Sequence, residues 1–431
     1  MKKQKRRSKT LILSEGKNQD TKEMSNVKNT KNQKLSKDSR NCVKSQTSQQ
    51  KGSLEKRRKD SNRIVKKSGS AESQKSTITA GVCSNPLNEN NKDKVVKKNI
   101  QEWYESFWSS DLKEYAKILR SPKYLSEKDP DIEAQNDEAN DKKSRYDDVL
   151  ALDRSRVVLK RTYSNSGSGP KKTDFIHANW VSQESMNNKY ILCQGPTAES
   201  IEDMWEMIFQ EDVGAIVQLC NFIELGEIKC NNYLPKTEET YGVFKVTFSG
   251  DVKTDLDGTL VREYEVIAPD GKKTKTTHFL VQNWPDHLVP KCHLFLIQLL
   301  AETKRIAKNR VIVTHCSAGI GRSGTYAALD YIYHGMVERN FSEPMELIKE
   351  MRYQRHGAVQ SYVQYLYCLV SLVEMFIQNG YINKDDRYYK LMDKYKVYYR
   401  KMYIIIDRKT RQKAEKKKKD KKRTPPRGND D

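Results

Sequence analysis

One cysteine and one arginine bracket a glycine-rich turn in the stretch VIVTHCSAGIGRSGTYAALD. Cys316 opens the turn after an apolar, β-branched run, and Arg322 closes it where a helical segment begins. The backbone N–H groups of such a turn bind anions, and this setting lowers a thiol pKa from about 8.5 to roughly 3.5–7.5. We therefore expect Cys316 to be a nucleophilic thiolate and Arg322 to hold two oxygens of a phosphoryl group.

A second interpretation of the same turn is a dinucleotide site, because Gly319, Gly321 and Gly324 satisfy G-x-G-x-x-G. Such a site needs an acidic residue at the end of the next strand, about 20 residues further on. The segment that follows, ERNFSEPMELIKEM, has the pattern of a helix instead. Cysteine chemistry on a phosphoryl group is the interpretation that the residues favour over an inert buried thiol.

The elements that must position this turn belong to a mixed α/β domain. Apolar runs predict buried strands at 214–220 and 311–315. Two further runs, 244–252 and 260–268, predict a hairpin with an Asp-Gly turn between them.

Helical spacing and capping signals predict helices on either side of these strands. One helix is expected over 199–209, with Ser200 and Asp203 as its capping box. Another is expected over 342–352, with Ser342 as its N-cap and Pro344 in its first turn.

The charge of the chain lies in its two ends. The 431 residues carry a formal net charge of +22. Residues 1–100 hold 27 Lys and Arg against 9 Asp and Glu, and residues 401–431 hold 13 against 5, which leaves 39 against 43 in between. A folded basic domain that binds nucleic acid by its surface is therefore disfavoured.

Composition also divides the chain into segments. Residues 1–95 contain no Phe, Trp or Tyr, so they cannot bury enough apolar surface to fold. Apolar residues return at helical spacing from Ile100, and a stripe of Tyr and Met follows Gly380. The predicted organisation is a disordered basic segment 1–95, a folded domain 100–378, an amphipathic tyrosine-rich helix 384–409 and a disordered basic segment 410–431. We expect that helix to pack on the domain, with a membrane-surface or partner helix as the alternative.

Several classes of protein are excluded by what the chain lacks. No apolar run approaches the roughly 18 residues that span a bilayer, and the N-terminus lacks the apolar core of a secretory signal. The eight cysteines are scattered without a zinc pattern or a disulfide framework. These features predict a cytoplasmic protein, with the basic segments as candidate nuclear signals.

The loop HCSAGIGRSG resembles the signature of the cysteine-based, non-receptor protein tyrosine phosphatases, and further motifs follow in that family's order. The resemblance implies one α/β tyrosine-phosphatase domain with a twisted mixed sheet flanked by helices. It also implies hydrolysis of phosphotyrosine on proteins through a phosphocysteine on Cys316, without a metal or cofactor. The phosphoryl group would lie in the cradle formed by Ser317, Ala318, Gly319, Ile320 and Gly321.

Other site residues are implied by the same resemblance. Trp284-Pro285-Asp286 implies that Asp286 is the general acid and then the general base, on a loop anchored by Trp284. SRYDDVLALDRSR implies a recognition loop in which Tyr146 stacks on the substrate ring and Asp148 binds the substrate backbone. The depth of the pocket would exclude phosphoserine.

Supporting roles are implied for six more side chains. Gln360 would position the hydrolytic water, with Gln364 assisting. Ser323 would donate to the sulfur, and His315 would fix the loop. Glu224 would orient Arg322, and Lys229 would contact the loop that carries Asp286, the acid loop.

Three positions depart from the family pattern. Leu288 replaces a common Gly in the acid loop, and His177 replaces a usual Asn, which we expect to affect support of the recognition loop. Asp147 stands where several relatives have a basic residue, so we expect a weaker preference for acidic substrate flanks.

Two alternatives stay open at this point. One is a weakly active or inactive domain that only binds phosphotyrosine proteins. The other places the function in the basic segments, as contacts with nucleic acid, anionic lipid or the cytoskeleton, against solvated tails without such a role.

Overall fold

The computed structural model describes residues 91–124, 130–164 and 171–423. Most strands of this part form one twisted sheet, in the order β1-β2-β3-β11-β4-β10-β9-β8-β7. These strands are β1 (Arg156–Val158), β2 (Phe175–Val181), β3 (Tyr190–Cys193), β4 (Val213–Gln218), β7 (Glu238–Tyr241), β8 (Phe244–Asp251), β9 (Thr259–Ile267), β10 (Lys273–Val281) and β11 (Val311–His315). A separate short hairpin consists of β5 (Ile223–Glu224) and β6 (Glu227–Ile228).

The centre of the sheet is parallel. β11 lies between β3 and β4 and pairs with both in parallel, and β10 continues this arrangement on the far side of β4. The outer strands are antiparallel, as in the predicted hairpin of β8 and β9, which is confirmed with Gly258 at a positive φ in its turn. The central strands are buried because helices cover both faces of the sheet.

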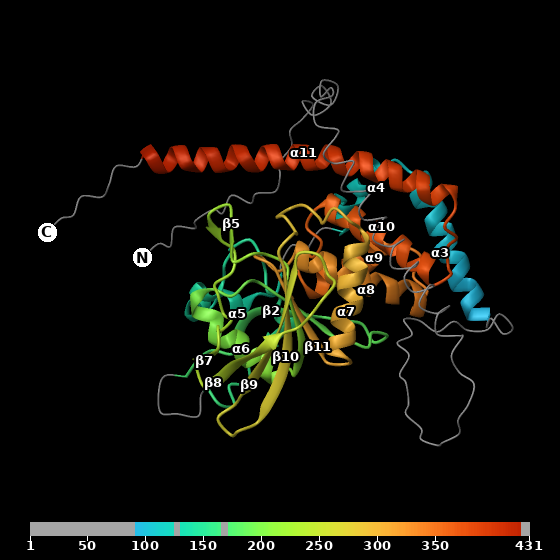
Figure 1. The fold of residues 1–431 in the computed structure, drawn as a ribbon. Helices are drawn as coiled ribbons and strands as arrows, with labels where there is room; N and C mark the ends of the chain where they lie inside the picture. The colour runs from blue at the N-terminus through green and yellow to red at the C-terminus, as the bar shows by residue number, and fades with distance from the viewer. Residues whose placement is uncertain (1–90, 125–129, 165–170, 424–431) are drawn as a thin grey trace, which may run out of the picture. The chain divides into compact units, whose positions relative to one another are not determined.

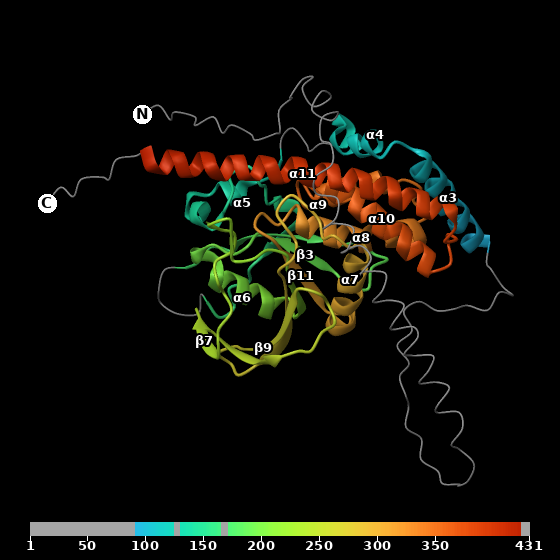
Figure 2. The ribbon, with the colours of Figure 1, turned by 45° about the horizontal axis from the view of Figure 1, so that its top comes forward.

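The helices are α3 (Asn91–Ser109), α4 (Leu112–Lys117), α5 (Glu133–Asn136), α6 (Ile201–Gln210), α7 (Leu294–Ala307), α8 (Arg322–Glu338), α9 (Pro344–Gln354), α10 (Tyr362–Gln378) and α11 (Asp386–Arg423). Figures 1 and 2 show α6 on one side of the sheet and α7 to α10 on the other. Helices α7 and α8 pack on β4 and β11, the strands that lead to the cysteine loop. The α/β fold class expected from the sequence is confirmed.

The predicted capping box of α6 and the predicted N-cap of α9 are wrong, although Ser200 is the N-cap residue of α6. Ser200 is not the partner of Asp203, because its hydroxyl accepts the N–H of Thr197 at 2.9 Å and closes a short turn before α6. Asp203 instead pairs with Arg161 at 2.8 Å inside the domain. At α9 the N-cap residue is Glu343 rather than Ser342, since Pro344 occupies the first helical position.

The ends of the domain differ from the predicted boundaries. Helix α3 already begins at Asn91, inside the segment 1–95 that we expected to be disordered, and residues 1–90 lie outside the described residues. Helix α11 continues to Arg423 instead of ending at 409, because Lys, Arg and Glu are good helix formers. Tyr388, Leu391, Met392 and Tyr395 of α11 are buried, and the helix contacts α3, α4 and α10.

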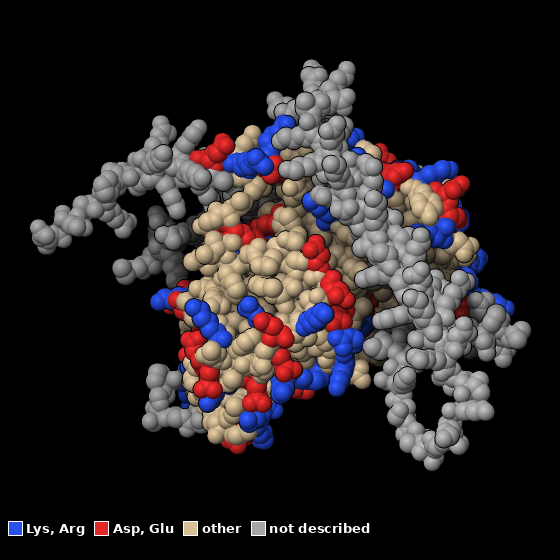
Figure 3. Space-filling model, in the orientation of Figure 1, with Lys and Arg blue, Asp and Glu red and all other residues tan. Residues whose placement is uncertain are grey.

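Charged side chains alternate in sign across the outer strands. Cross-strand pairs join Lys245 to Glu238 and Lys273 to Glu265, at 2.9 and 3.1 Å. Figure 3 shows the blue and red residues interspersed on this face of the domain. In the part of the chain that the structure describes, no helix has the length and apolar composition needed to cross a membrane.

Candidate active site

The cysteine loop lies at the carboxyl edge of the parallel strands. β11 ends at His315, residues 316–321 form the turn, and α8 begins at Arg322, as the sequence predicted. Gly319 has φ +73°, and a Cβ there would lie 2.1 Å from the carbonyl oxygen of Cys193. Only glycine is compatible with both the conformation and this close approach to β3.

The sulfur of Cys316 is buried within this turn. The N–H of Gly319 donates to Sγ at 3.3 Å, and Ser323 lies where its hydroxyl and N–H act on the same atom. Burial alone would raise the thiol pKa, but the charge of Arg322 and the donors of Ser323 and Gly319 outweigh it. The pKa of Cys316 therefore lies below its ordinary value, as expected of a nucleophilic thiolate.

Arg322 is held in a fixed orientation by the β5–β6 hairpin and the acid loop. Its guanidinium donates to both carboxylate oxygens of Glu224, at 2.7 and 3.1 Å, and to the carbonyl of Trp284 at 3.0 Å. The side chain is 1% exposed. A bidentate carboxylate fixes the plane of the guanidinium, so its remaining N–H groups are aimed before any anion arrives.

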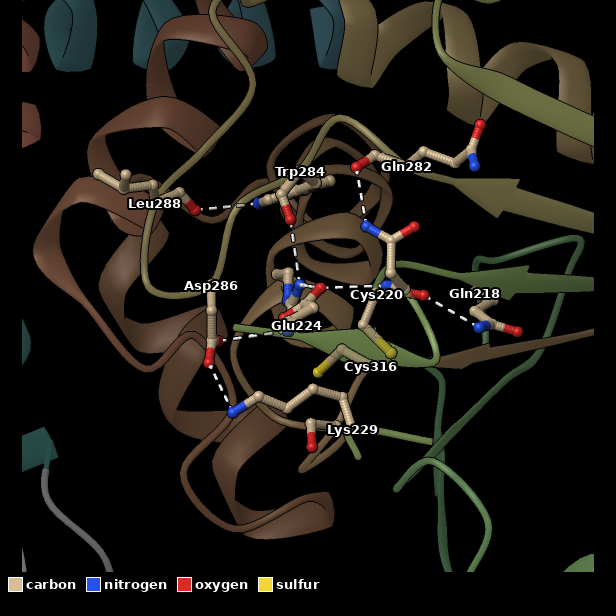
Figure 4. Close-up of polar contacts among 12 residues, drawn as sticks. Gln218, Cys220, Glu224, Lys229, Gln282, Trp284, Asp286, Leu288 and Cys316 are labelled. Carbon is tan, nitrogen blue, oxygen red and sulfur yellow. Dashed lines mark hydrogen bonds and ion pairs between the residues drawn. The ribbon is translucent and has the colours of Figure 1, made fainter. Parts of the chain in front are cut away.

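Asp286 lies over the same site. Its carboxylate is 3.3 Å from Arg322 and 3.4 Å from Lys229, and Figure 4 shows it pointing toward Lys229. Burial raises the pKa of Asp286, but the charges of Arg322, His287 and Lys229 lower it by more. The pKa therefore lies below the usual aspartate value. Without substrate, Asp286 is therefore ionised at neutral pH.

The acid loop is closed by a hydrogen bond across its turn. The indole N–H of Trp284 donates to the carbonyl of Leu288 at 2.9 Å, and Trp284 packs edge-on against Tyr367 of α10. Leu288 itself is buried. The residue of this turn with a left-handed backbone conformation is the preceding one, His287. The side chain that replaces the common glycine thus adds an apolar anchor to this loop.

The recognition loop meets the cradle at Tyr146. Its hydroxyl lies 2.7 Å from that of Ser317, whereas Asp147 and Asp148 are exposed beside it. The amide of Gln194 holds this loop by accepting the N–H of Arg145 at 2.9 Å.

Behind the cradle, His315 is neutral. Burial lowers its pKa to about 4, and its Nε2 lies 2.7 Å from the hydroxyl of Tyr233. Gln360 and Gln364 both lie against Gly321, where a Cβ would meet their amides at 3.0 and 3.1 Å. Gln364 also accepts the N–H of Ser361 in the capping box of α10, so part of its role is structural.

Arg355 is a site residue that the sequence reasoning missed. It is completely buried, and it donates to the carbonyls of Ala318 at 3.0 Å and Gly319 at 3.2 Å. It also donates to His177 Nδ1 at 3.3 Å, while His177 Nε2 donates to the carbonyl of Val149 at 3.0 Å. Burial, followed by the charge of Arg355, lowers the pKa of His177 to about 3, so the neutral ring joins the recognition loop to the cradle.

Arg145, beside Tyr146, was missed as well. It donates to the carbonyl of Gly195 at 3.0 Å and to the side chain of Asn231 at 2.9 Å. Neither arginine carried a signal in the sequence, because a lone cation in a polar stretch has the pattern of a surface residue.

We predict that Arg355→Met lowers kcat/KM by about 10²-fold, because the carbonyls of the cradle lose their donors and the loop shifts. Steady-state kinetics on an aryl phosphate measure this effect. Arg310→Met is the matched control, since Arg310 pairs with Asp212 at 2.6 Å away from the cradle. Equal losses in the two variants, or a loss only of thermal stability, would contradict a positioning role for Arg355.

Comparison with known proteins finds a family match over the segment that carries this site. The model of the protein-tyrosine phosphatase family matches residues 140–374, more than half of the chain. Human tyrosine-protein phosphatase non-receptor type 12 is 33% identical over 267 residues, which cover 59% of this chain and 33% of that protein. Rat tyrosine-protein phosphatase non-receptor type 7 is 34% identical over 227 residues, 52% of this chain and 61% of that protein. The chain thus spans less than two thirds of the length of either relative.

Proposed function

Because the chain belongs to the protein-tyrosine phosphatase family, we propose that it hydrolyses phosphotyrosine on proteins through a covalent phosphocysteine on Cys316. The observation that carries this proposal is the arrangement of three groups around one anion cradle. A thiol with a lowered pKa faces the cradle, Arg322 is fixed by Glu224, and Asp286 lies 3.3 Å from that arginine. A nucleophile, an anion fork and an acid are what phosphoryl transfer from a phenol requires.

In the first step, the Cys316 thiolate attacks phosphorus and the tyrosine oxygen leaves. The backbone of the cradle and Arg322 stabilise the charge on the transferring phosphoryl group. Asp286 donates a proton to the leaving phenolate.

Asp286 must gain that proton when substrate binds. In the free protein its carboxylate is paired with Arg322 and Lys229. A bound phosphoryl group pairs with Arg322 in place of Asp286 and brings negative charge close to the carboxylate. Both changes raise the pKa of Asp286. Substrate binding thus supplies the electrostatic change that makes Asp286 an acid.

In the second step, water hydrolyses the phosphocysteine. Asp286, now ionised, accepts a proton from this water, and Gln360 positions it against phosphorus. Ser323 supports the departing sulfur, because its buried hydroxyl acts on Cys316 and has no other hydrogen-bond partner within the described residues.

Selectivity for tyrosine follows from the position of Tyr146 at the mouth of the cradle. A phosphoserine side chain is too short to reach a buried sulfur past this ring, and Cys316 is 4% exposed. The test is a pair of peptides that differ only in phosphotyrosine or phosphoserine. Release of phosphate from the first alone supports the proposal, and equal release from both, or from neither, overturns it.

The exposed carboxylates of Asp147 and Asp148 predict substrate preference. We expect Asp147→Arg to raise kcat/KM for peptides with acidic flanks and to lower it for basic flanks, by a few-fold each, since exposed charge pairs are weak. Phosphopeptides with matched acidic and basic flanks measure this change. A strong acidic preference in the unaltered protein would contradict the prediction.

A binding module without turnover is the second candidate that the sequence left open. Such a domain would form a stable complex with phosphotyrosine peptides without releasing phosphate. The chain keeps all three residues, Cys316, Arg322 and Asp286; Asp286 pairs with Arg322, and the charge of Arg322 lowers the pKa of Cys316, which favours the enzyme. The roles proposed from the sequence for residues 1–95 and 410–431 stay predictions.

A further inference from the structure

Several free cysteines gather around the nucleophile. Cys193 ends β3, Cys316 follows β11, and Cys220 comes two residues after β4, so three adjacent parallel strands deliver thiols to one edge of the sheet. Cys230 approaches from the loop after β6. All four are buried and free of disulfide bonds.

These neighbours are not equivalent. The thiol of Cys230 donates to the carbonyl of Asn231 at 3.3 Å, so it is already engaged. Cys193 lies against Gly319 of the loop, and the cation that acts on its thiol is Arg355. Cys220 and Cys316 instead share the guanidinium of Arg322 as the principal charge acting on their thiols.

In the view of Figure 4 the sulfur atoms of Cys220 and Cys316 lie next to each other, and Cys316 is among the groups whose charge acts on the thiol of Cys220. Two hydrogen bonds hold the segment that carries Cys220. The carbonyl of Cys220 accepts the side-chain amide of Gln218 at 2.9 Å, and the backbone N–H of the preceding Leu219 donates to the backbone carbonyl of His315 at 2.8 Å. The residues that precede the two thiols are thus hydrogen-bonded to each other.

We propose that Cys220 is the resolving thiol that captures Cys316 after oxidation by hydrogen peroxide and stores the enzyme as an intramolecular disulfide. The inference rests on the proposed function only for the thiolate character of Cys316. It adds a modification site and assigns its partner.

The chemistry balances in two steps. The Cys316 thiolate attacks one oxygen of hydrogen peroxide, which gives the sulfenic acid and hydroxide. The thiol of Cys220 then attacks the Cys316 sulfur, the S–O bond breaks, and the thiol proton leaves with that oxygen as water. A dithiol reductant reduces the Cys220–Cys316 disulfide by two thiol–disulfide exchange reactions and is itself oxidised to a disulfide.

The surroundings of Cys220 suit this role. Burial raises its pKa well above the ordinary value, so it remains a thiol that competes neither for substrate nor for peroxide. It reacts only when Cys316 has become electrophilic. A disulfide at that stage protects Cys316 from the irreversible sulfinic and sulfonic acids.

The test treats the full chain with hydrogen peroxide until activity toward an aryl phosphate is lost, and then adds dithiothreitol. In the unaltered protein we expect activity to return, and peptide mass spectrometry before reduction to show a Cys220–Cys316 disulfide. Cys220→Ser should keep its activity before oxidation, lose most of the recovery, and accumulate sulfinic acid on Cys316. Cys230→Ser and Cys193→Ser are matched controls that should recover as the unaltered protein does.

A disulfide from Cys316 to any other cysteine, or full recovery in Cys220→Ser, would overturn this assignment. The mass measurement separates the inference from the proposed function, because it does not depend on turnover. Disulfide formation in a chain without phosphatase activity would leave the inference standing and refute the function. Phosphatase activity without that disulfide would support the function and refute the inference.

Discussion

Cys316→Ser is expected to lower kcat on phosphotyrosine peptides by at least about 10⁴-fold, since the loss of a nucleophile costs this much or more. A serine hydroxyl is not ionised near neutral pH, whereas the thiol of Cys316 has a lowered pKa beside Arg322. The variant should still bind phosphotyrosine peptides, because the backbone cradle and the fork of Arg322 remain. Single-turnover phosphate release and peptide binding by calorimetry measure the two effects.

Cys368→Ser is the matched control for this substitution. Cys368 is also completely buried, but it lies in α10 and burial raises its pKa. We expect it to keep full activity. Turnover that survives in Cys316→Ser, or loss of activity in both variants, would refute the assignment of the nucleophile.

Asp286→Asn is expected to lower kcat by roughly 10²–10⁴-fold, the usual contribution of a general acid or base. The asparagine keeps the size of the side chain but has no proton to give to the phenolate. The loss should be smaller for an aryl phosphate with an acidic phenol, because a good leaving group needs less protonation. Rates on two aryl phosphates of different phenol pKa measure this difference.

The pH dependence of kcat also tests whether Asp286 is the general acid. An acid works only while it is protonated, so kcat of the unaltered protein should fall as pH rises through the pKa of Asp286 in the bound complex. That fall should be absent in Asp286→Asn. Asp212→Asn is the control, since Asp212 has a lowered pKa from Arg310 outside the site and should keep the profile unchanged. A basic limb that persists in Asp286→Asn would assign the acid to another group.

The sequence predicted those parts of the fold that depend on local patterns. The strands around 214–220 and 311–315 are apolar and β-branched, and this pattern predicts buried strands. The turn of the hairpin requires a glycine, and Gly258 is present there. The cysteine loop was predictable for the same reason, because its glycines and its two reactive residues are contiguous in the sequence. The placement of Asp286 and Glu224 near it came from resemblance to a family.

Other features depend on distant parts of the chain and had no local signal. Arg355 is buried because the carbonyls of Ala318 and Gly319 and the side chain of Asn179 surround it, and these residues are far from it in the sequence. Ser200 is the N-cap residue of α6 but forms no capping box with Asp203, because its hydroxyl bonds backward to Thr197, a competition that spacing alone does not decide. The thiol cluster likewise needed the order of β3, β11 and β4 in the sheet.

The most direct test of a phosphocysteine mechanism is to trap the intermediate. The protein is mixed with an aryl phosphate, quenched in acid within the first turnover, digested, and mapped by mass spectrometry. We predict one phosphoryl group on the peptide that contains Cys316, in larger yield in Gln360→Ala because its second step is slower. Steady turnover with the phosphoryl group on another residue, or with no phosphorylated enzyme at any time, would contradict the mechanism.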